Sequence, residues 1–345
     1  MIAHCRPLAN FSLQSPRFPG HRRLMATERG FSLHTKRTQL VHASTASPET
    51  SSTQKETEKS TVNLTGPRPQ RFAVAEGQLN DVGSAAVAAL VRLGLGAFVL
   101  GYSSRLERED PQAEARYTLL SGLPGGFRLM ESSSIHKYAR PDDPLVIYDK
   151  QNCPECRMVR EAISILDLDI MFKPCPEGDG TVGWQSELAG KGLGQVPFMV
   201  DPNTGMEVGG GGEIVAYLFR NYGNNRPPLL LAGAGMIGIL LAKLALSPRG
   251  DKGGVALPAC TQPEKPLELW AYEASPFCVL VREALGEVGL AHVQRTCARG
   301  STKRQKLFER RGHFQVPYLE DPNTGVAMFE STAIIEYIRK TYGGV

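Results

Sequence analysis

One eleven-residue segment occurs twice in this chain with few changes. Residues 195–205 have the sequence QVPFMVDPNTG and residues 315–325 have the sequence QVPYLEDPNTG, so that eight of the eleven positions are identical. The shorter segment VREA also occurs twice, at 159–162 and at 281–284, ahead of each copy. Segments that recur together in this way indicate a duplicated structural unit, here of about 80 residues. We therefore expect one fold to be used twice.

The apolar and turn-forming residues predict the same order of elements in both copies. In the first copy, residues 145–148 form an apolar run suited to a buried strand, and Pro154 follows at the first position expected for a helix. The two DPNTG segments contain residues typical of tight turns between strands. The order β-α-β-α-β-β-α predicts an α/β fold in which each copy has a four-stranded mixed sheet with helices on both faces.

The first 43 residues differ in composition from the rest of the chain. They carry seven Lys and Arg residues and a single acid, Glu28, and they lack the 7–15 consecutive apolar residues of a secretory signal. This composition favours an organellar transit peptide, with a disordered tail as the alternative. Without these residues the net charge of +4 becomes about −2, so no basic surface for nucleic acid is expected.

Composition also suggests the boundaries of the remaining segments. Residues 44–80 are mostly rich in Ser, Thr, Glu, Lys and Pro, which predicts a disordered linker. Two apolar stretches, 83–101 and 229–246, contain the basic residues Arg92 and Lys243, which favours buried or interfacial helices over a membrane span. The predicted organisation is a transit peptide at 1–43, a disordered linker at 44–80, a helical or irregular lead segment at 81–143, a first module at 144–223, an apolar helical linker at 224–265 and a second module at 266–345.

Two cysteines at the start of the first predicted helix indicate thiol chemistry. Cys153 and Cys156 belong to the sequence CPEC. A cysteine just ahead of a helix lies near the positive end of the helix dipole and near unpaired backbone N–H groups, which lower the pKa of its thiol. We expect Cys153 to be exposed and nucleophilic, and Cys156 to be more buried and placed to resolve a mixed disulfide. Half of a zinc site is the alternative, but no second pair lies at ligand spacing, so no metal is expected.

At this point the residues resemble a known group of proteins. The CPEC turn resembles the Cys-Pro-x-Cys active site of glutaredoxins, and Val196-Pro197 resembles the Val-Pro whose proline is cis in thioredoxin-fold proteins. Phe329, Glu330 and Ser331 resemble the Glu-Ser motif of the N-terminal domain of glutathione transferases. The pattern is similar to plant and algal chloroplast proteins with tandem modules of these kinds. The resemblance implies two thioredoxin-like modules, glutathione as cosubstrate or ligand, and a chloroplast location, with the mitochondrion as the alternative.

The resemblance also implies which residues would hold glutathione. The backbone of the valine before each cis proline would pair with the cysteinyl part of glutathione, like an added strand. Ser331, at the start of the last helix, would bind the γ-glutamyl carboxylate, and the backbone of Gly210 and Gly211 would do so in the first copy. A plain helix cap is the alternative role of Ser331. The implied glutathione-binding residues are Val196, Pro197, Gly210, Gly211, Val316, Pro317, Glu330 and Ser331.

The two copies differ at the position of the expected nucleophile. Ser275 replaces cysteine there, and the second copy keeps only Cys278. The serine resembles that of plant transferases, in which a hydroxyl donates a hydrogen bond to the glutathione thiolate. We therefore interpret the first copy as the redox centre and the second as a glutathione-binding or degenerate partner. The candidate catalytic residues are Cys153, Cys156, Ser275 and Cys278.

These features together predict a glutathione-dependent thiol–disulfide oxidoreductase with Cys153 as its nucleophile. Its expected partners are glutathione and protein thiols or disulfides, with neither nucleic acid nor membrane favoured. Two alternatives remain open. One is a non-catalytic protein that binds glutathione or acts as a scaffold, and the other is a transferase-like conjugation that uses Ser275.

Overall fold

The structure, a computed structural model, describes residues 64–70, 74–110, 115–178, 184–191, 194–232, 235–258 and 260–344. The predicted transit peptide, which contains Cys5, and most of the predicted linker at 44–80 lie outside the described residues.

The two copies form modules with the same order of elements. The first module consists of β4 (Leu145–Asp149), α2 (Pro154–Ile165), β5 (Ile170–Pro174), α3 (Trp184–Gly190), β6 (Phe198–Asp201), β7 (Met206–Gly209) and α4 (Gly211–Tyr222). The second consists of β8 (Leu267–Ala271), α6 (Pro276–Val288), β9 (His292–Thr296), α7 (Lys303–Arg311), β10 (Tyr318–Asp321), β11 (Val326–Phe329) and α8 (Ser331–Tyr342). In each module the first two strands are parallel and the last two are antiparallel. The predicted α/β fold with two thioredoxin-like modules is confirmed.

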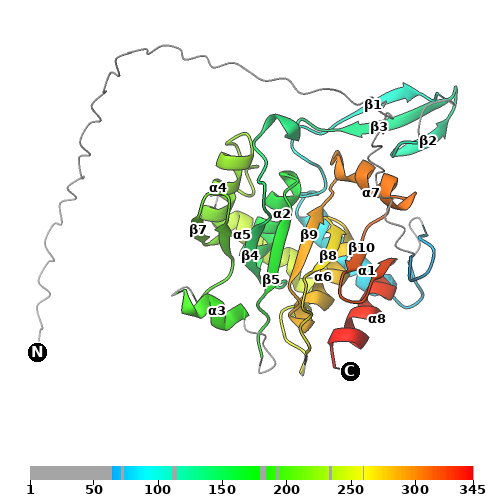
Figure 1. The fold of residues 1–345 in the computed structure, drawn as a ribbon. Coiled ribbons are helices and arrows are strands. Elements are labelled where there is room, and N and C mark those ends of the chain that lie inside the picture. Colours follow the sequence, from blue (N-terminus) through cyan, green and yellow to red (C-terminus); the bar gives the residue numbers. More distant parts are fainter. Residues whose placement is uncertain are drawn as a thin grey trace, which may run out of the picture. The chain divides into compact units, whose positions relative to one another are not determined.

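The two modules share one sheet, which the sequence does not predict. The strand order is β11-β10-β8-β9-β5-β4-β6-β7, so that the second strand of each module pairs with the other (Figure 1). This pairing is antiparallel and joins Ile170 to Gln294, Met171 to Val293 and Phe172 to His292. A free edge strand carries unpaired N–H and C=O groups, and joining two edges removes both. The modules are therefore related by an approximate two-fold axis near Met171 and Val293.

Two helices outside the modules pack over this junction. Helix α1 (Leu79–Val91) packs on α6, α5 (Gly235–Leu246) packs on α2, and α1 and α5 pack on each other. A short 3-10 helix, η2 (Ser247–Arg249), follows α5. No helix among the described residues is long and apolar enough to span a bilayer. Within the apolar stretch at 229–246, α5 thus packs on the first module and has Met236 and Leu240 exposed.

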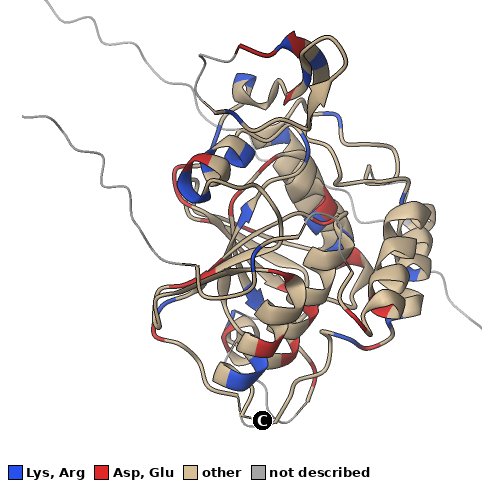
Figure 2. Ribbon diagram, turned by 90° about the vertical axis from the view of Figure 1, so that its right-hand side faces the viewer, with Lys and Arg blue, Asp and Glu red and all other residues tan. Residues whose placement is uncertain are grey.

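The repeated VREA segments form a buried network of ion pairs between the modules. Glu161 of the first copy binds Arg92, which caps α1, with an Nη2–Oε2 distance of 2.6 Å. Glu283 of the second copy binds Arg249 of η2 at 2.5 Å, so each repeated glutamate receives an arginine from outside its module. Figure 2 shows Lys and Arg interspersed with Asp and Glu along the ribbon. The sequence repeat thus marks an ionic contact as well as a shared fold.

Glu273 is the shared anion at the centre of this network. Its carboxylate lies 3.4 Å from Arg157, 3.1 Å from Arg160 and 2.5 Å from Arg282, and its side chain is 1% exposed. Arg160 also binds Asp149, at 2.7 Å. Although burial opposes it, the three arginines hold the pKa of Glu273 below its ordinary value. Arginines on α2 and α6 are therefore held by one carboxylate of the second module.

Each DPNTG turn is fastened to the last helix of its module. Asp201 accepts hydrogen bonds from the hydroxyls of Tyr217 and Tyr222 on α4, and Asp321 does the same with Tyr337 and Tyr342 on α8. Both aspartates are buried. The repeated aspartate is thus a buried acceptor that fixes the β6–β7 and β10–β11 hairpins, in addition to its predicted role in a turn.

The lead segment contains more regular structure than expected. Residues 81–143, for which the sequence indicates helix and irregular structure, also contain a three-stranded antiparallel sheet. Its strands are β1 (Ser103–Arg108), β3 (Phe127–Ser132) and β2 (Leu120–Leu123), in that spatial order, and a 3-10 helix, η1 (Ile135–Lys137), follows. Most side chains of β1 and β2 are exposed, so the apolar alternation that predicts a half-buried strand is missing.

Part of the predicted disordered linker at 44–80 is also ordered against the second module. The backbone N–H of Thr65 donates to the carbonyl of Ala327 at 2.7 Å, and the N–H of Gln70 donates to the carboxylate of Glu330 at 2.7 Å. Strand β11 lies at the edge of the sheet, and its free backbone groups supply the partner that the linker sequence lacks by itself.

Candidate functional site

The CPEC turn has the geometry expected for a redox pair. Cys153 is the N-cap of α2, and its sulfur accepts a hydrogen bond from the backbone N–H of Cys156 at 3.4 Å. Pro154 occupies the first helical turn, where its missing N–H costs no hydrogen bond. Cys153 is half-buried and Cys156 is fully buried, and both are free thiols. The structure thus places the first sulfur outward and the second behind it.

The two thiols have pKa values shifted in opposite directions. A hydrogen bond from the Cys156 thiol, helped by the Cys156 backbone N–H, lowers the pKa of Cys153 to about 7 against the opposing effect of burial. Burial raises the pKa of Cys156 well above that of a free thiol. Near neutral pH a substantial fraction of Cys153 is therefore thiolate, whereas Cys156 remains a thiol until its partner has reacted.

Alkylation of Cys153 by iodoacetamide is expected to rise with pH around a midpoint near 7. The rate follows the thiolate fraction, so peptide mapping by mass spectrometry gives the titration of this residue alone. The pKa of Cys153 in the folded state lies below the ordinary value of about 8.5 for a free cysteine. Ionisation of Cys153 therefore stabilises the folded state fully above about pH 8.5, and this stabilisation is lost as the pH falls through about 7. In Cys156→Ala the midpoint should move up toward the ordinary value. A wild-type midpoint near 8.5 would contradict the assignment.

In the first module, one of the predicted glutathione-binding residues, Gly211, is already hydrogen-bonded to a carboxylate of the chain itself, that of Glu155. The Val196–Pro197 bond is cis, and the N–H of Gly210 donates to the carbonyl of Pro197 at 3.1 Å. The next N–H, that of Gly211, donates to the side chain of Glu155 at 2.9 Å. The start of α4, which the resemblance assigns to the glutathione carboxylate, is thus bonded to a side chain from the CPEC turn.

The matching residues of the second module surround an open cavity. Ser275 caps α6 as Cys153 caps α2, and its hydroxyl accepts from the N–H of Cys278 at 3.4 Å. Cys278 is buried, and burial raises its pKa, so its thiol is not placed to react. The Val316–Pro317 bond is cis. Of the two candidate catalytic residues in this module, Ser275 reaches the cavity and Cys278 does not line it.

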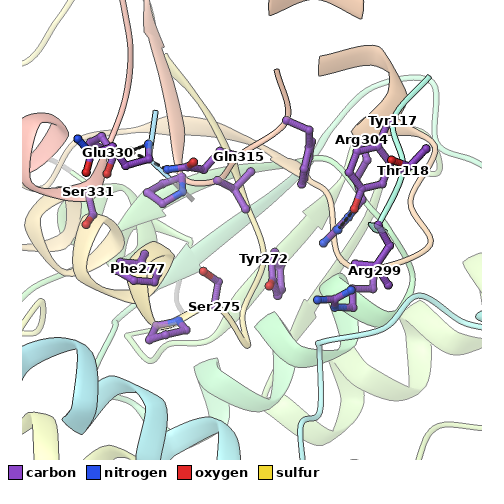
Figure 3. A pocket seen from close by; sticks show the side chains of 16 residues that line it. Tyr117, Thr118, Tyr272, Ser275, Phe277, Arg299, Arg304, Gln315, Glu330 and Ser331 are labelled. Carbon is purple, nitrogen blue, oxygen red and sulfur yellow. Dashed lines mark hydrogen bonds between the residues drawn. The ribbon is translucent and has the colours of Figure 1, made fainter. Parts of the chain in front are cut away.

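This cavity has a volume of about 340 Å³ and contains all the predicted binding residues of the second module. In Figure 3, Ser275 lies between Glu330 and Ser331 at one end and Arg299 and Arg304 at the other. The lining also includes residues that sequence analysis did not identify, namely Gln70, Tyr117, Thr118, Leu119, Tyr272, Phe277, Arg299, Arg304, Phe314 and Gln315. Ser275 therefore lies in the middle of the cavity, between its Ser331 end and its arginine end.

The arginine end of the cavity is held in place by the lead segment. Glu131 of β3, whose side chain is 1% exposed, accepts from Arg299 at 3.1 Å and from Arg304 at 3.3 Å. Tyr117 accepts from Arg304 at 2.6 Å and donates to Glu131 at 2.9 Å. The sequence repeat does not point to Tyr117 or Glu131, because both lie in the lead segment, outside the two copies. Gln315 could have been identified, since Gln195 precedes Val-Pro in the first copy in the same way.

Two further cysteines and the described acidic and histidine residues show no sign of a reactive or metal-binding site. Cys175 and Cys297 are buried, and burial raises the pKa of Cys175 to about 12. Within the described ranges, no group of three or more His, Cys, Asp or Glu residues is arranged to hold a metal ion.

The comparisons with known proteins agree with the duplicated fold. The model of the glutathione S-transferase N-terminal domain matches residues 147–226 and again residues 269–345. No curated protein and no solved structure matches the chain. The two matched segments correspond to the two modules of the joined sheet. Each of the two thioredoxin-like modules is thus similar to the glutathione S-transferase N-terminal domain.

Proposed function

We propose that the chain is a thiol–disulfide oxidoreductase of the glutathione-related thioredoxin fold, with Cys153 as its nucleophile. The observation that carries this proposal is the CPEC turn at the start of α2. There Cys153 is partly exposed with a pKa of about 7, and Cys156 lies buried behind it with a raised pKa. An attacking thiol is most effective when its pKa is near the ambient pH.

The exchange proceeds through two substitutions at sulfur. The Cys153 thiolate attacks one sulfur of a substrate disulfide, forms a mixed disulfide and releases the first substrate thiolate, which takes a proton from water. Cys156 then loses its proton and attacks the Cys153 sulfur, forming the Cys153–Cys156 disulfide and releasing the second thiolate. The substrate gains two electrons and the cysteine pair loses two. Two molecules of a reducing thiol restore the pair by the reverse exchange and leave as a disulfide.

A second function, glutathione binding in the second module, is favoured by its cavity. The two ends of the cavity match the two carboxylates of glutathione, with Ser331 at the start of α8 at one end and Arg299 and Arg304 at the other. The backbone of Val316 would pair with the cysteinyl residue between them. The Ser275 hydroxyl accepts one hydrogen bond from Cys278 and can still donate its own proton to a thiolate. This second site would also be the place for conjugation.

The oxidoreductase is tested by turnover of bis(2-hydroxyethyl) disulfide, which must depend on Cys153. Glutathione binding is tested separately by titration with S-methylglutathione, which cannot exchange with a disulfide. We expect one bound molecule per chain.

A further inference from the structure

We propose that Glu155 determines the specificity of the first module, because its carboxylate occupies the place of the glutathione γ-glutamyl carboxylate. The inference rests on the proposed function and assigns each module a different ligand. The first module would exchange with disulfides that lack a γ-glutamyl group, such as those of proteins or peptides, and glutathione would bind in the second.

The two modules present the same backbone to this ligand group. Gly210, with φ of +84°, precedes α4, and Glu330, with φ of +73°, precedes α8. The next residues, Gly211 and Ser331, begin their helices. The backbone N–H groups of Gly211 and Ser331 therefore lie at the N-terminus of a helix, where the helix dipole favours the binding of an anion. The turn alone therefore does not distinguish the modules.

The difference comes from the residue before the second cysteine position. In the first module this residue is Glu155, whose carboxylate accepts from the Gly211 N–H at 2.9 Å. In the second module it is Phe277, which lines the cavity and has no group to offer to Ser331. Among the described residues, the N–H of Ser331 has no hydrogen-bond partner. The carboxylate-binding N–H is thus occupied in one module and free in the other.

Close packing fixes Glu155 in this position. A Cβ added to Gly211 would lie 2.9 Å from the Cβ of Glu155 and 3.2 Å from its carbonyl oxygen. Only glycine leaves room for the two helix starts to approach this closely. Since the backbone of Glu155 lies against Gly211, its carboxylate reaches the N–H at little cost in side-chain entropy. An external carboxylate would have to displace it and would meet a like charge beside the same N–H.

The test uses the full chain and reciprocal substitutions, with binding of S-methylglutathione followed by isothermal titration calorimetry. Wild type is expected to bind one molecule per chain. Glu155→Ala should gain a second site. Phe277→Glu, which places a carboxylate opposite Ser331, should weaken the wild-type site at least tenfold. The double variant should bind one molecule, at the first module.

The outcomes separate this inference from the proposed function. A stoichiometry that stays unchanged in Glu155→Ala would overturn the role of Glu155, and full affinity in Phe277→Glu would count against it independently. A wild-type chain that binds nothing while Glu155→Ala binds one molecule would refute glutathione binding in the second module and support the role of Glu155. The oxidoreductase proposal is tested independently of these binding experiments, by the exchange of bis(2-hydroxyethyl) disulfide at Cys153.

Discussion

Replacing Cys153 by serine is expected to reduce turnover of bis(2-hydroxyethyl) disulfide by about a thousandfold or more. The thiolate of Cys153 is the group that attacks the substrate sulfur, and a serine hydroxyl is not ionised at neutral pH. The neighbouring Cys156 cannot replace it, because it is fully buried and its pKa is raised. The measurement is the rate of thiol release with a saturating reductant.

Two further variants test the role of the second cysteine and provide a control. Cys156→Ser keeps the nucleophile but not the resolving thiol, so the mixed disulfide on Cys153 should accumulate and be visible by mass spectrometry without reductant. Cys278→Ser is the matched change in the second module, and it should leave turnover unchanged because Cys278 is buried beside Ser275. Turnover that persists in Cys153→Ser would refute the assignment of the nucleophile.

Replacing Glu273 by glutamine should lower the free energy of unfolding by about 3–5 kcal/mol. The change removes the charge that Arg157, Arg160 and Arg282 share, and leaves these guanidinium groups in a buried site with too little counter-charge. The side chain of Glu273 is 1% exposed, so water cannot take the place of the carboxylate. The measurement is the urea midpoint at an unchanged slope.

The matched control for this prediction is Glu207→Gln. Glu207 pairs with Lys191 at 2.6 Å, but their side chains are 44% and 32% exposed, so the expected loss is at most about 1 kcal/mol. Equal, small losses in the two variants would show that the buried network does not hold the modules together.

The fold within each module could be predicted from the sequence because its signals are local. The apolar run at 145–148, the proline after Cys153 and the DPNTG turns each specify a short segment, and their repetition gives two independent indications of one fold. The same is true of the residues around Ser275 and Glu330, which the fold brings to one cavity. Local patterns of this kind depend little on what surrounds them.

The contacts between segments could not be predicted in this way. The pairing of Met171 with Val293 depends on two edge strands meeting, and no residue pattern distinguishes a joined edge from a free one. Arg304 belongs to an ordinary charged helix in the sequence, and it becomes part of a cavity only when Tyr117 and Glu131 lie over it. Glu155 is one residue of the CPEC turn in the sequence, and only the fold brings its carboxylate to the N–H of Gly211.

The most direct test of the division between the modules is a crystal structure of the full chain with S-methylglutathione. We predict that the ligand lies in the cavity of the second module, with one carboxylate at Ser331 and its sulfur beside Ser275, while Glu155 still accepts from Gly211 in the first. A ligand beside Cys153 and Val196, with Glu155 displaced, would contradict the account.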